Sequence, residues 1–241
     1  MTATETFDVG WFMYDDLGAH MFPAPRPGLE AAPAPLSRKA VQACPSVRDV
    51  QARSFDLLSP YNLDIAVERS GEKYRIDLNL ARSSVALSAA RDVVVPNERR
   101  RWRHPDRPVL QISVPYCFFS DVDATLTQTA PIGGESLGEN VAVISGRYAI
   151  RNWIRPMSVA LEFRRTPARL TVRRNDPLCT LLFDGPTPSA SPRLVRARKT
   201  EALVAFTAGC AGVTSKISDT ASAMARAATV RPKTLLEPAD E

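Results

Sequence analysis

The densest group of charged side chains lies in the stretch NERRRWRHPDRP, residues 97–108. It places several arginines around one aromatic residue: Arg99, Arg100, Arg101, Arg103 and Arg107 around Trp102. Arginine binds phosphate and tryptophan stacks on bases, so the stretch suits a nucleic acid or an acidic protein surface. The interpretation we favour is a solvated loop whose arginines pair with neighbouring aspartate and glutamate and do not support the fold.

A second group that could carry chemistry consists of carboxylates and arginines on predicted strands. Asp64 and Asp77 fall in two alternating segments joined by a short turn, and Arg147 and Arg151 follow later in the chain. These four residues are our candidates for an enzyme site at the mouth of a β-sandwich, binding a small molecule.

The sequence offers little for a metal or a cofactor. His20 follows Asp15 and Asp16 at a spacing that suits a metal, but a histidine in a turn is the interpretation we favour. His104 lies among arginines, which disfavour a neutral ligand. The glycine-rich segment 133–140 lacks the Lys-Ser/Thr pair of a phosphate-binding loop. We therefore expect no cofactor and no metal.

The four cysteines are widely spaced, and no pair has the C-x-x-C spacing of a zinc or redox site. They are Cys44, Cys117, Cys179 and Cys210. Because the N-terminus also lacks the basic and apolar regions of a secretion signal, we expect free thiols and a cytoplasmic protein. The longest apolar runs are far too short to span a bilayer, so we expect no membrane association. The net charge of +5 permits an acidic partner without requiring one.

Alternation of apolar and polar residues dominates positions 54–184. Residues 63–67 and 74–80 alternate on either side of a turn that contains Gly71, which predicts a β-hairpin. Strands that follow one another without helical crossovers build antiparallel sheets. We therefore predict a mainly β fold, an antiparallel β-sandwich of jelly-roll type with a C-terminal helical appendage. The predicted core includes Leu78, Ile112, Leu161 and Leu182.

The composition divides the chain into four regions. The predicted boundaries are an extended, proline-rich N-terminal segment (1–36), a β-sandwich domain (37–188), a helical C-terminal region (189–230) and a disordered tail (231–241). Within the helical region, apolar spacing and glycines predict helices at about 193–208 and 213–228. The segment 83–94 fits either a short helix or a strand.

The stretch RRNDPLCTLLFD, residues 173–184, combines a turn with a strand that is apolar on both faces. Asn-Asp-Pro is turn chemistry, so we interpret Asp176 as a turn residue and not as part of a site. A strand with two apolar faces needs a cover on each side. The C-terminal helices or another copy of the chain are the two available covers, and we expect self-association through this region.

Three segments resemble a family of uncharacterised bacterial and phage β-sandwich domains of unknown function. The segments are ACPSVRDVQARSFDLLSPYNLDIAV, VLQISVPYCFFSDVDATLTQTAPI and ISGRYAIRNWIRPMSVALEFRRTPARLTVRRNDPLCTLLF, within about residues 40–184. The resemblance implies no catalytic residues. The late strand and YNLDIAV also resemble trimeric deoxyuridine triphosphatases, but the glycine-rich C-terminal motif of that family is absent here.

These features favour a non-catalytic binding or assembly module that forms a homo-oligomer, such as a phage-related structural protein. Two alternatives remain: an enzyme that uses the carboxylate and arginine candidates, and a nucleic-acid binder that uses the arginine loop at 98–107.

Overall fold

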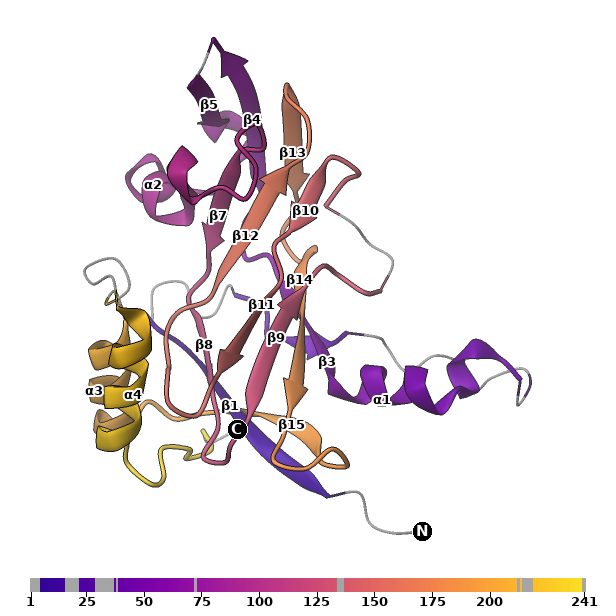
Figure 1. The fold of residues 1–241 in the computed structure, drawn as a ribbon, viewed down its shortest axis with the longest axis vertical. Coiled ribbons are helices and arrows are strands. Elements are labelled where there is room, and N and C mark those ends of the chain that lie inside the picture. The colour runs from indigo at the N-terminus through magenta and orange to yellow at the C-terminus, as the bar shows by residue number, and fades with distance from the viewer. Residues whose placement is uncertain are drawn as a thin grey trace.

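The computed structural model describes residues 5–15, 22–28, 37, 39–71, 73–133, 137–211, 213 and 219–239 (Figure 1). The fold is mainly β, with 38% strand and 22% helix, as the alternation predicts. Its strands pair antiparallel except at one position, and the described strands close no barrel. The predicted fold class is confirmed.

The largest sheet is built around the strand that the sequence marks as apolar on both faces. Its five strands run in the order β11-β9-β14-β3-β2. They are β11 (Gly146–Ala149), β9 (Thr125–Thr129), β14 (Pro177–Asp184), β3 (Ser54–Leu58) and β2 (Arg26–Pro27). The central position of β14 explains its composition, because a central strand is covered by neighbours and by packing on its faces.

A four-stranded sheet shares the main core with the first. Its strands run in the order β10-β12-β7-β6. They are β10 (Val141–Val143), β12 (Ser158–Phe163), β7 (Val109–Ser113) and β6 (Val94–Pro96). Predicted core residues Ile112 and Leu161 lie on β7 and β12, and both are fully buried.

The predicted hairpin is present in a three-stranded sheet. Strands β4 (Leu63–Ser70) and β5 (Lys73–Leu78) pair antiparallel, and β13 (Ala168–Val172) flanks β4. Gly71 in the connecting turn has φ of +62°, a backbone conformation that glycine adopts without steric cost. Leu78 is only half-buried because β5 is the edge strand of this small sheet.

The fourth sheet joins distant parts of the chain. Strand β1 (Thr6–Met13) pairs parallel with β15 (Ser191–Arg196) and antiparallel with β8 (Tyr116–Phe119). The prediction of a helix at 193–208 is therefore wrong over its first residues, and the region 189–230 is not wholly helical. The prediction failed because β15 is set by its long-range pairing with β1, which no local pattern reveals.

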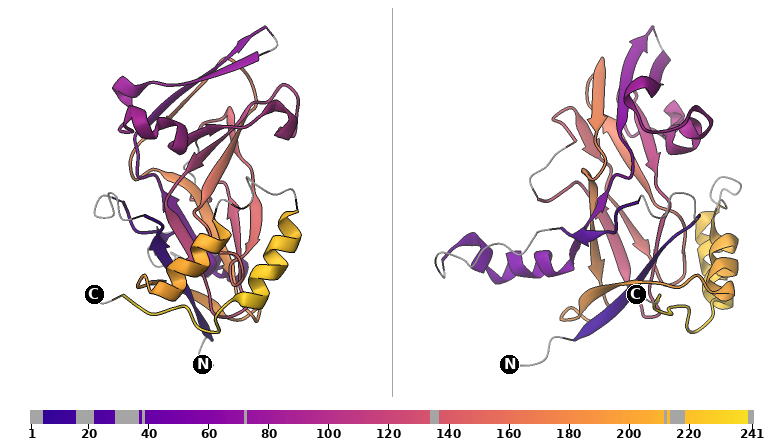
Figure 2. Two further views of the ribbon diagram at one scale, coloured as in Figure 1. Left: turned by 90° about the vertical axis from the view of Figure 1, so that its left-hand side faces the viewer. Right: turned by 180° about the vertical axis from the view of Figure 1, so that it is seen from behind.

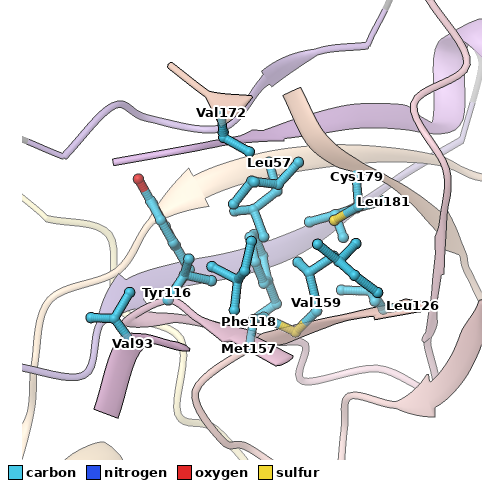
Figure 3. Packing of buried hydrophobic residues seen from close by; sticks show 14 of the residues in the cluster. Leu57, Val93, Tyr116, Phe118, Leu126, Met157, Val159, Val172, Cys179 and Leu181 are labelled. Atoms are coloured by element: carbon cyan, nitrogen blue, oxygen red, sulfur yellow. The ribbon is translucent and has the colours of Figure 1, made fainter. Parts of the chain in front are cut away.

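One main core fills the space between the sheets. Figure 3 shows side chains from several strands converging in it, among them Leu57, Phe118, Val159 and Leu181. Phe183 of β14 packs edge-on against Phe55 and tilted against Phe118, with ring centroids 5.8 and 5.7 Å apart. Leu182, the fourth predicted core residue, is half-buried on the other face of β14.

A second, smaller core lies beneath two C-terminal helices, α3 (Glu201–Cys210) and α4 (Thr220–Val230). Leu203 and Phe206 of α3 pack with Phe12, Phe119 and other buried residues from the β1–β8 side of the molecule. Figure 2 shows the two helices side by side against the sheets. They therefore do not form the cover on β14 that the sequence suggested.

The second face of β14 is closed by other segments. The Thr180 hydroxyl donates to Asp56 at 2.7 Å and accepts from the backbone N–H of Ile132 at 3.1 Å. A helix, α1 (Pro45–Arg53), also contacts this strand. At the start of β14 the Asp176 carboxylate accepts from the backbone N–H of Arg173 at 2.7 Å, which supports the turn interpretation.

The remaining short elements include the ambiguous segment 83–94. It contains a 3₁₀ turn η3 (Leu87–Ala89), a one-turn helix α2 (Ala90–Val93) and the start of β6, so both interpretations were partly right. Other 3₁₀ turns are η1 (Val41–Ala43), η2 (Leu80–Arg82) and η4 (Arg99–Arg101). Among the described residues, no helix is long and apolar enough to cross a membrane.

Residues 231–239 of the C-terminal tail pack against the fold, contrary to the predicted disorder of 231–241, of which 240 and 241 lie outside the described residues. Leu235 is buried in the second core, and Pro238 forms a β-bridge with Ala197. Of the N-terminal segment 1–36, β1 and β2 belong to sheets, whereas 29–36 lie outside the described residues, as does His20.

Candidate functional site

The first predicted site residue, Asp64, lies on β4, and its buried carboxylate pairs with Arg169 of β13, whose side chain is 54% exposed. Arg169 Nε donates to Oδ1 at 2.6 Å, and its Nη2 donates to Oδ2. Asn79 Nδ2 lies 3.4 Å from Oδ2, and Arg82 Nη1 lies 4.0 Å from the same oxygen. The carboxylate thus has donors on both oxygens and is held by two segments of the chain, β13 and residues 79–82.

The electrostatics of this pair do not favour acid–base catalysis. The hydrogen bonds from Arg169 are the main cause that lowers the pKa of Asp64 below the ordinary aspartate value. A general base works best when its pKa lies near the operating pH, and here the pKa is shifted in the opposite direction. Asp64 is therefore suited to fixing β13 against β4.

The structure separates the four enzyme candidates into two groups. Asp77 shares a hollow of about 560 Å³ with Asp64, where it pairs with Arg75 at 2.6 Å. Arg147 and Arg151 lie by a different hollow, of about 300 Å³. There Arg147 pairs with Asp184 at 3.3 Å and Arg151 pairs with Asp123 at 3.1 Å. All four candidates are thus occupied by local ion pairs.

The arginine loop is attached to the fold through a buried carboxylate. Glu162 on β12 has a side chain only 3% exposed, and it accepts from Arg103 at 3.1 Å and pairs with Arg107 at 3.6 Å. A buried carboxylate needs such partners, because an unpaired buried charge is costly. Arg103 and Arg107 thus attach the loop to β12, an arrangement that speaks against the expectation that the loop does not support the fold. The pairing of its arginines with nearby acids is present.

The aromatic residue of the loop is also engaged. Trp102 donates from Nε1 to the carbonyl of Asn97 at 2.8 Å and packs edge-on against Tyr74, with ring centroids 5.1 Å apart. On η4, Arg99 donates to the Pro105 carbonyl and Arg100 pairs with Glu98. The ring thus serves the fold and is not presented as a flat stacking platform.

Arg101, the remaining arginine of the loop, is exposed; its backbone N–H donates to the Glu98 carbonyl at 2.8 Å, and its side chain has no hydrogen bond or ion pair to another described residue. It is the loop residue best placed to meet an anionic partner. One such side chain gives a weak electrostatic attraction and no defined site.

The described residues contain no group of three or more His, Cys, Asp or Glu that could hold a metal ion. The four cysteines are free. Burial raises the pKa of the Cys117 and Cys179 thiols, so both stay protonated and unreactive. Cys44, at the N-terminus of α1, is exposed, and backbone N–H groups of Val47 and Ser46 lower the pKa of its thiol.

An apolar groove of about 370 Å³ lies between α3 and α4. We call it the α3–α4 groove. The described residues that line it are almost all apolar or small, with Arg226 as the one charged residue among them: Trp153, Ala205, Phe206, Gly209, Cys210, Val213, Ala223, Arg226, Ala227 and Val230. The volume lies in the range of ordinary binding pockets, and the lining is of the apolar type that such pockets have.

The surfaces of α3 and α4 that face the groove carry mainly small residues, which leave space between the two helices. Thr200 caps α3 by accepting from the backbone N–H of Leu203 at 3.2 Å, and Asp219 caps α4 by accepting from Ser222 at 3.0 Å. Between them, Gly209 has no heavy atom within 4 Å of where a Cβ would lie. The two helices are thus fixed at their starts while the space between them stays open.

One apolar side chain of the groove reaches the surface: Val230, which lines it, is 73% exposed. The sequence showed the apolar spacing of the second helix, but the groove itself was missed. It arises from the position of the pair over Trp153, a residue far away in the chain.

Comparison with known proteins adds no assignment. No family model matches the sequence, and no curated protein matches it.

Proposed function

We propose that the protein is a non-catalytic assembly module that self-associates through the face carrying the α3–α4 groove. The observation that carries this proposal is the groove itself, an apolar concavity lined at one end by the exposed Val230. Apolar surface is stabilised when it leaves water, and connected apolar patches on a protein surface mark interaction sites.

The state of the charged residues supports a binding role over a catalytic one. Asp64, Asp77, Arg147 and Arg151 each have an opposite charge within hydrogen-bonding or ion-pair distance. An acid–base or nucleophilic site needs a reactive group that faces open space with a tuned pKa. Among the residues that the structure describes, those lining the α3–α4 groove include no carboxylate and no histidine.

Two finer statements accompany the proposal. The resemblance to bacterial and phage domains supports a structural role in a phage-related assembly. The free thiols fit a reducing compartment, which supports a cytoplasmic location.

The proposal is tested by sedimentation velocity over a wide range of protein concentration. We expect the wild-type chain to form oligomers and the Val230→Asp variant to remain monomeric, because a carboxylate would have to be buried in the contact. The matched control is Leu87→Asp, since Leu87 is equally exposed but lies on η3, away from the helices. A wild-type chain that stays monomeric at every concentration would overturn the proposal.

A further inference from the structure

An arginine from β4 joins the arginine loop on the surface of the protein. Asp106 of the loop pairs through one carboxylate oxygen with Arg69 at 3.7 Å and with Arg99 at 3.8 Å. All three side chains are about half exposed. Because two guanidinium groups share one carboxylate, positive charge remains in excess at this place.

A second arginine joins the loop from the end of β12. The backbone N–H of Phe163 donates to the Pro108 carbonyl at 2.9 Å. The residue after Phe163 is Arg164 and the residue before Pro108 is Arg107, so these two arginines are neighbours in space. Both are exposed. The fold thus gathers arginines that lie far apart in the sequence.

These residues form a surface with a net positive charge. We call the five arginines of the loop, together with Arg69 and Arg164, the arginine patch. Seven arginines stand against four described carboxylates, which leaves a net charge of +3; the carboxylates are Glu98, Asp106, Glu139 and Glu162. Glu68, next to Arg69 in the chain, lies on the other face of β4, where it lines the hollow that contains Asp64. Each guanidinium has five N–H donors, so the pairs described leave donors for a further anion.

The arginine patch has no apolar centre. Of the large apolar side chains that are exposed in the described part of the chain, none lies in the loop, on β4 or on β12. The ring of Trp102 is engaged with Tyr74 and the Asn97 carbonyl. Protein partners bind chiefly through apolar and aromatic anchors, and single-stranded nucleic acids stack on exposed aromatic rings. The phosphate backbone of a duplex requires only positive charge and N–H donors.

We infer that the arginine patch binds the phosphate backbone of a double-stranded nucleic acid without reading its sequence. Arginine suits this role because its planar guanidinium binds phosphate oxygens in pairs. Asp106 and Glu162 hold four of the arginines in place by ion pairs. The inference goes beyond the proposed self-association and does not depend on it, since the patch and the described lining of the α3–α4 groove share no residue.

Fluorescence anisotropy with a labelled DNA duplex over a series of salt concentrations tests the inference. With a random sequence of about 20 base pairs, we expect the logarithm of the binding constant to fall with the logarithm of salt concentration with a slope of about −3 or steeper. Duplexes of different sequence should bind equally well, because phosphate contacts carry no sequence information.

The test variant carries Arg101→Ser and Arg164→Ser. Neither side chain has a carboxylate partner among the described residues, so the variant should fold, which thermal melting checks. We expect about tenfold weaker binding at low salt and a slope that is shallower by about 2, because each phosphate contact contributes about 0.9. The matched control carries Arg26→Ser and Arg48→Ser, which removes the same charge from exposed positions on β2 and α1. It should bind like the wild type.

The other outcomes overturn the inference. If the wild type fails to bind the duplex at low salt, the patch is not a nucleic-acid surface. Equal weakening in the two double variants would mean that the charge of the whole chain attracts the duplex, without a defined patch. Tighter binding of a single strand of the same length would contradict duplex recognition. Polyglutamate or phosphatidylserine vesicles that displace the duplex at equal charge concentration would assign the patch to an acidic protein or to a membrane surface.

Discussion

Arg231 and Asp121 form the ion pair that fastens the C-terminal tail to the end of β8. The Arg231 side chain is only 3% exposed, and its Nη2 donates to Asp121 at 2.7 Å and to the Ser120 carbonyl at 2.9 Å. The same carboxylate accepts from the backbone N–H groups of Leu235 and Leu236, each at 3.0 Å. Asp121 thus binds both Arg231, at the C-terminal end of α4, and the backbone of the segment that follows it.

Replacing Arg231 with Met should destabilise the fold by about 3–5 kcal/mol, because it leaves Asp121 without its cation and several carbonyls without their donor. Arg147→Met is the matched control. Its ion pair with Asp184 is exposed, so its loss should change the free energy of unfolding by no more than about 0.5 kcal/mol. Urea unfolding of the two variants checks this. Equal losses of stability in the two variants would mean that the Arg231–Asp121 ion pair does not hold the C-terminal tail to the fold.

Removing both partners of Glu162 should destabilise the protein, whereas removing the outer arginines should not. We expect the double change Arg103→Ala and Arg107→Ala to cost about 2–3 kcal/mol, reduced from the fully buried value because both arginines are partly exposed. The control pair Arg100→Ser and Arg101→Ser should stay within about 0.5 kcal/mol of wild type.

The same control pair tests the nucleic-acid alternative. If the loop binds a polyanion, the Arg100→Ser and Arg101→Ser pair should weaken binding and reduce its dependence on salt concentration. Fluorescence anisotropy with a labelled oligonucleotide over a series of salt concentrations measures both quantities. Unchanged affinity and slope would rule out the outer arginines as phosphate contacts.

Asp64 should make the protein sensitive to acid. Arg169 lowers the pKa of Asp64 in the folded state, so the folded state binds the proton less readily than the unfolded state. The resulting stabilisation is present above the unfolded pKa, near 3.8, and is lost as the pH falls through the lower folded value. Asp64→Asn should therefore show a shallower fall of stability with decreasing pH. A pH series of denaturant midpoints checks this, and parallel curves would contradict it.

Two leucines test the burial of the core. Leu161→Ala should lower the free energy of unfolding by about 3 kcal/mol, because Leu161 is fully buried between β10 and β7. Leu182→Ala should cost only about 1 kcal/mol, since that side chain is half-buried. Urea titration measures both losses in the free energy of unfolding, and they are compared where the two variants unfold with the same dependence on urea concentration. If Leu182→Ala lowered the free energy of unfolding as much as Leu161→Ala, the face of β14 that carries Leu182 would be more tightly packed than its half-burial indicates.

The turn before β14 gives a prediction on backbone conformation. Asn175 has φ of +72°, so Asn175→Gly should be neutral or slightly stabilising, whereas Asn175→Val should cost more than about 1 kcal/mol. Asp176→Ala should cost about 1 kcal/mol through loss of its bond to the Arg173 N–H. Thermal melts rank the three variants. A reversed order of Gly and Val would contradict the positive φ.

Local patterns in the sequence determined much of the fold. The alternation around Gly71 predicted the β4–β5 hairpin, since side-chain period and turn chemistry act within a few residues. The Asn-Asp-Pro turn and the apolar faces of β14 were predicted for the same reason. The absence of helices between most strands predicted antiparallel sheets, because parallel strands need long crossovers.

Long-range contacts decided the rest. Strand β15 forms because Ser191–Arg196 pairs with β1, more than 180 residues earlier, and local composition there does not favour a strand. Arg103 pairs with the buried carboxylate of Glu162, which lies 59 residues further along the chain. The α3–α4 groove exists because the fold sets two small-residue helices over Trp153. Each of these features depends on contacts between segments that are distant in the sequence. No short stretch of the chain determines the free energy of such contacts.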